Sequence, residues 1–527
     1  MTPTWLATLE RWKSRYGDGE DARLEGLLAA SVRRKLQGAA ALIELHETLL
    51  FLRAYPRSAA VARLADAALA AFPARLAEFA ASGADLDAFE DPEISGIAGT
   101  SLCGVFTHEF ARRLAARHPR SIEIGWDRYD EIDRLGPLLA RLLALFAEDW
   151  PVEAHAPFRQ WIEAAKPRGA GDLAWLLQCL AALPVPPRDR AALYETLGLP
   201  LTWRFDARTS RGALRLPRRR LFLHREPLLR RADVSIAREL AGPRLPVRRL
   251  ARPEARRVLD LILDVSAMRF RELYGFSHPD EAGVYHADAG RGVDIYYFGV
   301  PPEWRLPLRA YHGGMFFKNG VPAGYVELLS FFERAEVGFN LYYTFREGES
   351  AWLYARTLKL FHQELGVSVF SVDPYQIGHE NPEAIDSGAF WFYRKLGFRP
   401  VDPEAAALMD REERRMRQTP GHRSSKRTLE RLARSYILYE GPASEPGAWD
   451  RFRIRNLALR AERNSAPAAT PLEKAFALMP GWRSWSPEEK RAAEEIARAK
   501  QSGSEARYLR LMQRHARFRA ALLAAGS

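Results

Sequence analysis

The dipeptide Asn319-Gly320 stands between two apolar, aromatic-rich segments, residues 309–317 (RAYHGGMFF) and residues 322–332 (PAGYVELLSFF). Asn-Gly favours the positive φ angles of a type I′ turn, so this pattern is the strongest short-range signal for a β-hairpin. Residues 292–300 and 336–345 are also rich in aromatic and β-branched residues, as strands are. Together the four segments predict an antiparallel meander.

The sequence after the meander alternates between helix and strand. Residues 349–366 (ESAWLYARTLKLFHQELG) predict a helix closed by its final glycine, and residues 367–372 (VSVFSV) predict a strand. A second helix carries Tyr393, has Gly397 at its C′ position, and leads into a strand that begins at Phe398. With an amphipathic helix before the meander, the predicted order is helix, antiparallel strands, helix, strand, helix, strand.

Changes in composition divide the chain into four segments. Residues 1–183 have a helical period nearly throughout, whereas residues 184–252 are rich in Pro and Arg and predict a connecting segment with one short strand at 221–224 (LFLH). Residues 253–401 carry the meander, and residues 402–527 predict a helical, basic extension. The expected fold class is α+β: a mixed, mostly antiparallel sheet flanked by helices, with an α-helical N-terminal domain and a helical C-terminal extension.

Two local features refine the C-terminal extension. Residues 435–441 (SYILYEG) offer an extra strand. Ser486 and Pro487 stand in the N-cap and N1 arrangement that begins a helix.

The composition indicates a soluble, globular, multidomain protein. Of the 527 residues, 47% are hydrophobic, which is enough for sizeable cores. No apolar run reaches the roughly eighteen residues of a membrane span, and the N-terminal segment carries charges where a signal peptide needs an apolar core. We therefore expect a cytoplasmic protein with no membrane partner. Cys103 and Cys179 stand far apart in apolar contexts, which excludes a disulfide framework and indicates buried thiols.

The formal net charge of +12 raises the question of nucleic-acid binding, because clustered Lys and Arg neutralise phosphates. The densest basic runs are residues 218–220, 230–231 and 411–434. They are not interleaved with stacking aromatics, and no zinc-finger, recognition-helix or RNA-binding signature accompanies them. Nucleic acid is therefore kept only as a third hypothesis, and an acidic cofactor would use part of the same charge.

Residues 388–401, GAFWFYRKLGFRPV, resemble the closing motif of the GNAT family of N-acetyltransferases. In that family a helix carries a Tyr toward the cofactor sulfur, and a Gly lets the chain turn into a final strand packed by a Phe. Tyr393, Gly397 and Phe398 hold those places here. The resemblance implies a GNAT-like fold over residues 253–401, acetyl-CoA or another acyl-CoA as cosubstrate, an amine acceptor, and Tyr393 as the acid that protonates the departing thiolate.

The resemblance also places the cofactor. Pantetheine would pair with the strand expected at residues 337–345, and the following loop would present backbone N–H groups to the pyrophosphate at a helix N-terminus. Glu349 stands where the family pattern has Gly, Gly348 comes one residue early, and Asp386 replaces an Asn. A plain strand-to-helix turn, with acidic residues favourable at the helix N-terminus, is the other interpretation. The implied cofactor-binding residues are Leu341, Tyr342, Tyr343, Thr344, Phe345, Arg346, Gly348, Ser350, Ala351 and Asp386.

Two glutamates are candidates for the base that deprotonates the amine. Ala335-Glu336-Val337 resembles the Ala-Glu-Ile/Val of the histone-acetylating branch of the family, so Glu336 is the first candidate. Glu327 is the alternative, because its apolar neighbours predict partial burial and a raised pKa. Either side chain would also be compatible with a solvent-facing place on a strand. His312 is a further candidate, although a lone His in an aromatic strand is more often a hydrogen-bonded core residue.

The sequence thus carries three functional hypotheses. The first is acyl-CoA-dependent N-acyl transfer, with acetyl transfer to an amine by direct attack. The second is a catalytically degenerate GNAT-like protein that serves as a binding or scaffold protein, and the third is nucleic-acid binding. Neither a metal-binding motif nor a Gly-rich nucleotide motif occurs, so no metal is expected.

Overall fold

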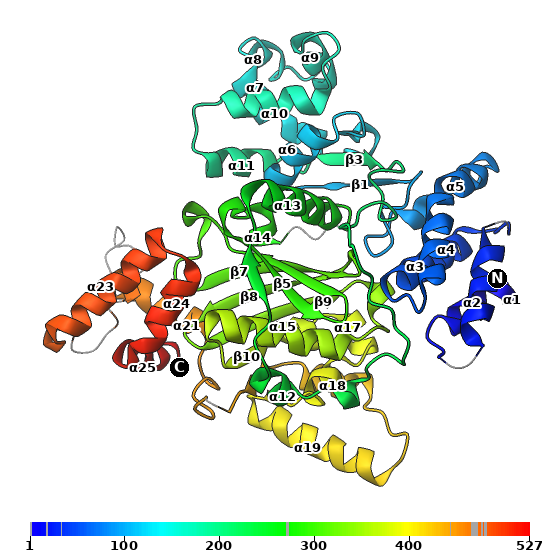
Figure 1. Cartoon of the computed structure of the whole chain (residues 1–527). Coiled ribbons are helices and arrows are strands. Elements are labelled where there is room, and N and C mark those ends of the chain that lie inside the picture. The colour runs from blue at the N-terminus through cyan, green and yellow to red at the C-terminus, as the bar shows by residue number, and fades with distance from the viewer. Residues whose placement is uncertain are drawn as a thin grey trace. The chain divides into compact units, whose positions relative to one another are not determined.

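The computed structural model describes residues 3–16, 19–32, 34–269, 273–442, 444–464, 473–475, 478 and 482–527. The chain forms two compact units (Figure 1). Unit 1 consists of Met1–Pro227, Arg256–His278 and Lys318–Pro322, and unit 2 consists of Leu228–Ala255, Pro279–Phe317 and Ala323–Ser527. Each unit is described by itself.

Unit 2 is built on a nine-stranded sheet with the order β11-β12-β10-β9-β8-β7-β6-β5-β4. The mixed α+β architecture expected from the sequence is confirmed at this level. The strands are β4 (Val247–Arg249), β5 (Val284–Gly290), β6 (Val293–Phe298), β7 (Ala310–Lys318), β8 (Val321–Phe331), β9 (Arg334–Leu341), β10 (Val369–Val372), β11 (Arg399–Pro400) and β12 (Ile437–Glu440).

The predicted hairpin is present between β7 and β8. Asn319 has φ 49° and Gly320 has φ 81°, as the two central residues of a type I′ turn require. The last strand of the meander differs from the prediction, because β9 ends at Leu341 and Tyr343–Phe345 form a 3-10 turn. Strands β4 and β5, at the far edge of the sheet, were not predicted.

A parallel crossover follows the meander. Helix α15 (Ser350–Leu365) ends at Gly366, whose φ of 73° makes the left-handed C-cap that the sequence predicted. The helix lies across one face of the sheet, where its apolar side chains join the main core (Figure 1). Strand β10 then pairs in parallel with β9, but only through Arg334, Ala335 and Glu336.

The helix predicted to carry Tyr393 is α18 (Ala389–Arg394), which follows α16 (Pro374–Ile377) and α17 (Pro382–Asp386). Gly397 has φ 106° after α18, in agreement with its expected role in the turn. After α19 (Pro403–Gln418) and α20 (Lys426–Leu432), the extra strand predicted at residues 435–441 appears as β12, inserted between β10 and β11.

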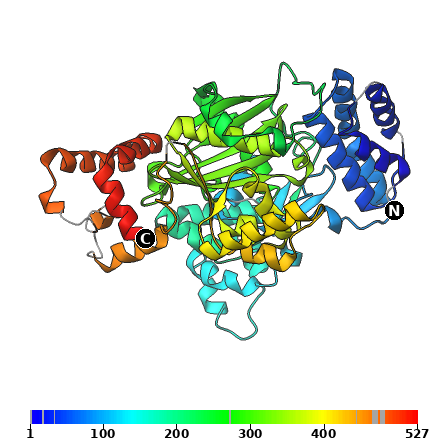
Figure 2. The same ribbon diagram turned by 90° about the horizontal axis from the view of Figure 1, so that it is seen from below.

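The end of unit 2 is helical, as predicted. Helices α21 (Ile454–Arg463), α23 (Pro487–Ser502), α24 (Glu505–Arg514) and α25 (Ala516–Gly526) form a group (Figures 1 and 2), with α21 against α25 and α24 against α15. Ser486 caps α23, where its side chain accepts from the N–H of Glu489.

Unit 1 is mostly helical, but it is not all-α as expected. Its helices are α1 (Thr4–Trp12), α2 (Glu20–Ser31), α3 (Ala39–Ala54), α4 (Ala59–Ala70), α5 (Phe72–Ala81), α6 (His108–Arg117), α7 (Gly136–Leu142), α8 (Phe146–Asp149), α9 (Phe158–Ala165), α10 (Asp172–Ala182), α11 (Pro187–Glu195), most of α13 (Arg252–Ala267) and α14 (Tyr274–Ser277). An antiparallel sheet in the order β1-β3-β2 joins β1 (Ser101–Val105), β2 (Ile122–Ile124) and β3 (Pro200–Arg204). The helical expectation for residues 1–183 is therefore wrong for β1 and β2. Their partner β3 comes about a hundred residues after β1, and a local period cannot reveal such a pairing.

The strand predicted at residues 221–224 is absent, because side-chain bonds hold this segment instead of a strand partner. Asn319 accepts from the N–H of Phe222 at 2.8 Å, and its amide donates to the carbonyl of Phe222 at 3.0 Å. The same amide donates to the carbonyl of Ala54 at 2.8 Å. The side chain of Asn319, in the hairpin turn, thus bonds to two other segments of unit 1.

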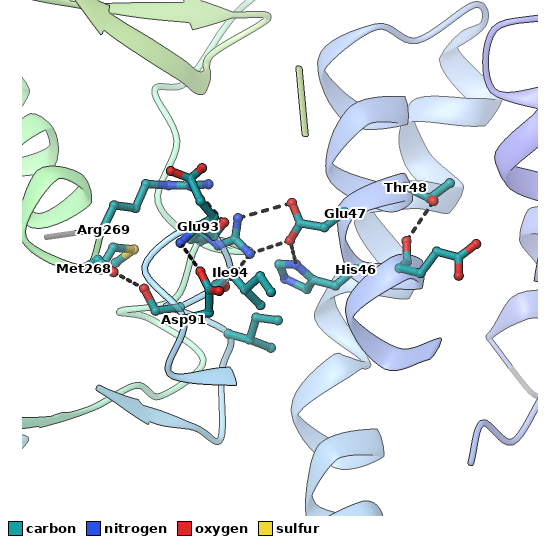
Figure 3. Close-up of polar contacts among 12 residues, drawn as sticks. His46, Glu47, Thr48, Asp91, Glu93, Ile94, Met268 and Arg269 are labelled. Carbon is teal, nitrogen blue, oxygen red and sulfur yellow. Dashed lines mark hydrogen bonds and ion pairs between the residues drawn. The ribbon is translucent and has the colours of Figure 1, made fainter. Parts of the chain in front are cut away.

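A buried polar group ties α3 to later segments of unit 1 (Figure 3). Glu47 is 8% exposed and forms an ion pair with Arg211, which also donates to the carbonyl of Ile94 at 2.6 Å. His46 lies against the same carboxylate, with its Nδ1 3.3 Å from Glu47 Oε1. Burial lowers the pKa of His46 to about 4, so this imidazole is neutral at pH 7.

Candidate functional site

A row of polar side chains lies on one face of β7, β8 and β9. Glu336 pairs with Leu329, and Glu327 pairs with Gly338, so both glutamates lie on the same face as diagonal neighbours. The opposite face carries Val326, Leu328 and other apolar residues of the core that α15 covers. The register thus places the two candidate bases together, on the face that α15 leaves uncovered.

Glu336 is the more available of the two. In the described part of the chain its carboxylate has no hydrogen-bond or ion-pair partner. Burial raises its pKa, an effect that Arg309 and Arg334 oppose and Asp373 reinforces. A half-buried carboxylate with a raised pKa and free oxygens has the properties of a general base.

Glu327 is already engaged. The hydroxyl of Tyr311, from β7, donates a hydrogen bond to its Oε1. Burial raises the pKa of Glu327, and the bond from Tyr311 partly offsets this. A substrate would have to replace Tyr311 before Glu327 accepted its proton.

Glu336 faces a cavity of about 370 Å³ within unit 2. Four arginines also line it: Arg309, Arg334, Arg453 and Arg455. They come from the segment before β7, from β9, and from the start of α21. Arg334 and Glu336 lie two residues apart on β9 and so share one face, whereas the other three arginines reach the cavity through tertiary packing.

Beyond Glu336 the pairing of β9 with β10 ends, and the side chain of Gln376 bonds to the backbone of β9. Its amide donates to the carbonyl of Val337 at 3.1 Å and accepts from the N–H of Phe339 at 3.3 Å. Gln376 belongs to α16, which directly follows β10. The backbone edge that β10 leaves is therefore paired by a side-chain amide, and no feature of the sequence pointed to this residue.

Tyr393 lies on the other side of the sheet from Glu336. It is 5% exposed and packs against Tyr354 of α15, with ring centroids 5.4 Å apart. Tyr354 in turn packs against Phe339 of β9 at 5.0 Å. Burial raises the pKa of Tyr393 well above its usual value, so its hydroxyl stays protonated. In the described residues no hydrogen bond or ring contact joins Tyr393 to Glu336 or Glu327.

Tyr354 is a polar residue that the sequence reasoning missed. Its side chain is fully buried, and its hydroxyl has no hydrogen-bond partner among the residues described. An unpaired buried hydroxyl costs about 1–3 kcal/mol, so such a group next to Tyr393 marks a place where a ligand atom would be stabilising.

The loop before α15 holds the residues assigned to the pyrophosphate. Arg346 pairs with Glu383 and donates to the carbonyl of Leu341 at 3.3 Å. Glu347 is exposed, whereas Glu349 is 2% exposed and its carboxylate is held by Arg291. The N–H of Leu229 also donates to Glu349 at 3.2 Å. A neutralised carboxylate therefore lies at the start of α15.

The remaining predicted positions are spread over this region. Tyr342, Thr344 and Phe345 are buried, Tyr343 is 62% exposed, Ser350 is half-buried, and Ala351 is buried in the first turn of α15. Asp386 is exposed at the end of α17. These residues therefore do not share one surface.

His312 is not part of the polar row. It follows Tyr311 on β7, so it lies on the opposite face, with its ring 6.5 Å from that of Phe361 of α15. Burial lowers its pKa. The structure therefore does not bring His312 together with the two glutamates.

Cys103 and Cys179 are free and half-buried, so the expectation of buried thiols is only partly met. Across the described ranges, no helix is long and apolar enough to cross a membrane. Within the same ranges, no group of three or more His, Cys, Asp or Glu is placed to hold a metal ion. In comparisons with known proteins, no protein-family model, no curated protein and no solved structure matches this chain.

Proposed function

We propose that unit 2 transfers an acyl group from an acyl-CoA to an amine, with a GNAT-like arrangement of β9, α15, β10 and α18. One observation carries the proposal. The pairing of the parallel strands β9 and β10 ends at Glu336, and this glutamate has a raised pKa, oxygens with no hydrogen-bond partner among the described residues, and a cavity before it. A base next to a strand edge that a side-chain amide occupies, and that a ligand amide could take over, suits direct transfer between an extended thioester and an amine.

The strand edge suits the pantetheine arm of the cofactor. Val337 offers a carbonyl and Phe339 offers an N–H to the amide of Gln376. A pantetheine amide carries the same donor and acceptor and would take the place of Gln376, as an added strand pairs with a sheet edge. The pyrophosphate would then lie near α15, where Arg291 offsets the charge of Glu349.

The residues of unit 2 would divide the proton transfers between them. The attacking amine forms an amide with the acyl carbon as the carbon–sulfur bond breaks. Glu336 accepts the proton that the amine loses. Tyr393 or Tyr354 returns a proton to the thiolate, because burial keeps both hydroxyls protonated. Glu327 remains the alternative base once the hydroxyl of Tyr311 is displaced.

One observation favours the second candidate, a binding or scaffold protein that has lost acyl transfer. Glu349 is buried at the helix N-terminus where the family presents glycine to the pyrophosphate. Its pairing with Arg291 leaves a local arrangement that is stable without a bound anion.

Titration calorimetry on the full chain separates these candidates. We expect acetyl-CoA and its non-reactive analogue desulfo-CoA to bind at micromolar concentration, and thiol release to follow when amines are added with acetyl-CoA. Binding without thiol release across a broad panel of amines would favour the scaffold. The absence of binding at high micromolar concentration would exclude both the transfer reaction and a cofactor-dependent scaffold.

A further inference from the structure

The cavity in front of Glu336 is unusually rich in positive charge. Its wall holds Arg309, Arg334, Arg453 and Arg455, against the single carboxylate of Glu336. Asp373, which also raises the pKa of Glu336, does not line the cavity. Tyr436 also lines the cavity; burial and the nearby Glu336 and Asp373 raise its pKa to about 12, and its hydroxyl is hydrogen-bonded to Asp373.

None of the four arginines forms an ion pair with a carboxylate in the described parts of the chain. Arg309 and Arg453 are half-buried and Arg455 is exposed, but Arg334 is buried. Other buried arginines, such as Arg211 and Arg53, have acidic partners. Arg453 donates to the carbonyls of Asp450 and Phe452, at 2.9 Å and 2.8 Å, and to no side chain. The excess charge of the cavity is therefore not compensated by the protein.

Arg334 is the clearest example of a positive charge in the cavity that no carboxylate compensates. It is 8% exposed, and burial lowers its pKa to about 10. Its guanidinium donates only to Ser371 Oγ and to the carbonyl of Phe452, at 3.2 Å and 3.4 Å. The rings of Tyr436, Trp449 and Phe452 surround it at 5.7, 5.7 and 5.9 Å. These rings hold the guanidinium in place without neutralising it, so a bound anion would gain strong, charge-assisted hydrogen bonds.

We propose that this cavity binds the anionic group of the acceptor, a carboxylate or a phosphate carried by the same small molecule that presents the amine. Anion binding follows from the arginines alone, whereas its assignment to the acceptor rests on the proposed acyl transfer. Arg334 and Glu336 are two residues apart on one face of β9, about 7 Å along the strand. The amine and the anionic group would therefore be separated by only a few bonds, as in an amino acid or an aminoalkyl phosphate.

The geometry of β9 distinguishes this anion from the phosphates of the cofactor. Arg334 is the first residue of β9, whereas the loop that precedes α15 follows its last residue, Leu341. Seven residues of extended chain span about 23 Å. A pyrophosphate at the start of α15 would thus be too distant from Arg334 to occupy the cavity.

The anion site is tested on the full chain with inorganic sulfate and with succinate, in the absence of any acyl-CoA. We expect both probes to bind by calorimetry at millimolar concentration, and Arg453→Gln and Arg455→Gln each to weaken binding at least fivefold. Arg334→Gln should have a larger effect if the variant folds. Arg451→Gln is the matched control, because Arg451 is exposed two residues from Arg453 and does not line the cavity.

The outcomes separate this inference from the proposed function. Equal sulfate affinity in wild type, Arg453→Gln and Arg455→Gln would overturn the anion site, even if acetyl-CoA binds. Displacement of sulfate by desulfo-CoA would also overturn it, because the cavity would then hold the cofactor. Sulfate binding that follows the arginines, without any acyl-CoA binding, would support the site and contradict the transfer reaction. If the chain binds both sulfate and acyl-CoA, thiol release only with amines that carry an acidic group would support the assignment of the cavity to the acceptor.

Discussion

The guanidinium of Arg291 donates hydrogen bonds to the carboxylate of Glu349 at the start of α15, with Nε 2.9 Å from Oε1 and 3.1 Å from Oε2. Glu349 is almost fully buried, so its carboxylate is shielded from solvent, whereas the side chain of Arg291 is 28% exposed. Removing one member of a buried pair leaves an uncompensated charge, which costs about 3–5 kcal/mol. The pair therefore decides how the loop before α15 is folded.

We expect Arg291→Ala to lower the free energy of unfolding of unit 2 by about 3 kcal/mol or more, measured by urea denaturation. Arg244→Ala is the control, because the pair of Arg244 with Glu364 has an arginine that is 71% exposed. Such an exposed pair contributes about 1 kcal/mol or less. Equal losses in the two variants would show that Glu349 is not held by Arg291 in solution.

Gln376→Ala removes two hydrogen bonds from the edge of β9, to Val337 and Phe339. We expect a loss of about 1–3 kcal/mol in stability and a severalfold tighter binding of desulfo-CoA, because the edge no longer has to be vacated. Gln363→Ala is matched, since Gln363 makes the same two kinds of bond to the backbone of Leu245. Gln363→Ala should lose similar stability without binding desulfo-CoA more tightly. Tighter binding of desulfo-CoA by both variants would contradict the pairing of pantetheine with the edge of β9.

The role of Glu336 predicts a pH dependence. Its pKa is raised, so the active carboxylate form appears only as pH increases through a value above the ordinary carboxyl range, and the rate of transfer should rise over that interval. Glu336→Gln should lower kcat by about 10²–10⁴-fold and abolish this rise.

Arg309 lowers the pKa of Glu336, so Arg309→Gln should move the rise in rate to higher pH. Arg451→Gln, which removes an exposed charge, should leave the profile in place. If Glu327→Gln rather than Glu336→Gln abolished the rise in rate with pH, Glu327 would be the base.

His46 predicts an acid sensitivity of unit 1. Burial lowers its folded pKa to about 4, whereas the unfolded value is 6.5, so the unfolded chain binds the extra proton first. The contribution of the neutral imidazole is complete above pH 6.5 and declines as pH falls toward 4, by about 3 kcal/mol at most.

Hydrogen exchange of the α3 amides, corrected for intrinsic rates, measures this decline, and His46→Gln should flatten it. Arg211 and His46 together hold the pKa of Glu47 below its usual value despite burial, and its own contribution is lost only below about pH 4.5. The interval from pH 6.5 to 4.5 therefore isolates His46. An unchanged slope in His46→Gln would contradict the assignment.

The hairpin turn predicts that an alanine substitution destabilises unit 1 more at Gly320 than at Gly83. At Gly320, which has φ 81°, an added Cβ would lie 2.2 Å from the carbonyl oxygen of Leu216. At Gly83, which has φ 78°, it would meet nothing within 4 Å. Gly83→Ala should cost about 1 kcal/mol from its backbone angle alone, and Gly320→Ala at least about 2 kcal/mol more. Equal urea midpoints for the two variants would show that the turn moves away from Leu216.

Local signals in the sequence predicted the local structure well. Asn319-Gly320, Gly366 and Ser486 each act through the backbone angles or end groups of their own segment, and each has its expected place; Gly397 has the expected positive φ but lies one residue beyond the predicted C′ position. The strand predicted from Glu336 onward did not include Arg334, whereas β9 begins at Arg334 and so places both residues on one face. The prediction was wrong about the end of β9, which stops at Leu341. No local residue marks the change from strand to turn there.

Tertiary structure alone decided the composition of the candidate site. The sequence offered Glu336 as the first candidate base and Glu327 as the alternative, but only the structure shows that Tyr311 engages Glu327 and that a cavity lies before Glu336. Arg291 neutralises Glu349 from 58 residues away. Arg309 precedes β7 and Arg453 precedes α21, and both reach the same cavity. A sequence period specifies which side of a strand a residue occupies, but partners on other elements depend on how those elements pack, and a single sequence does not encode that in any local pattern.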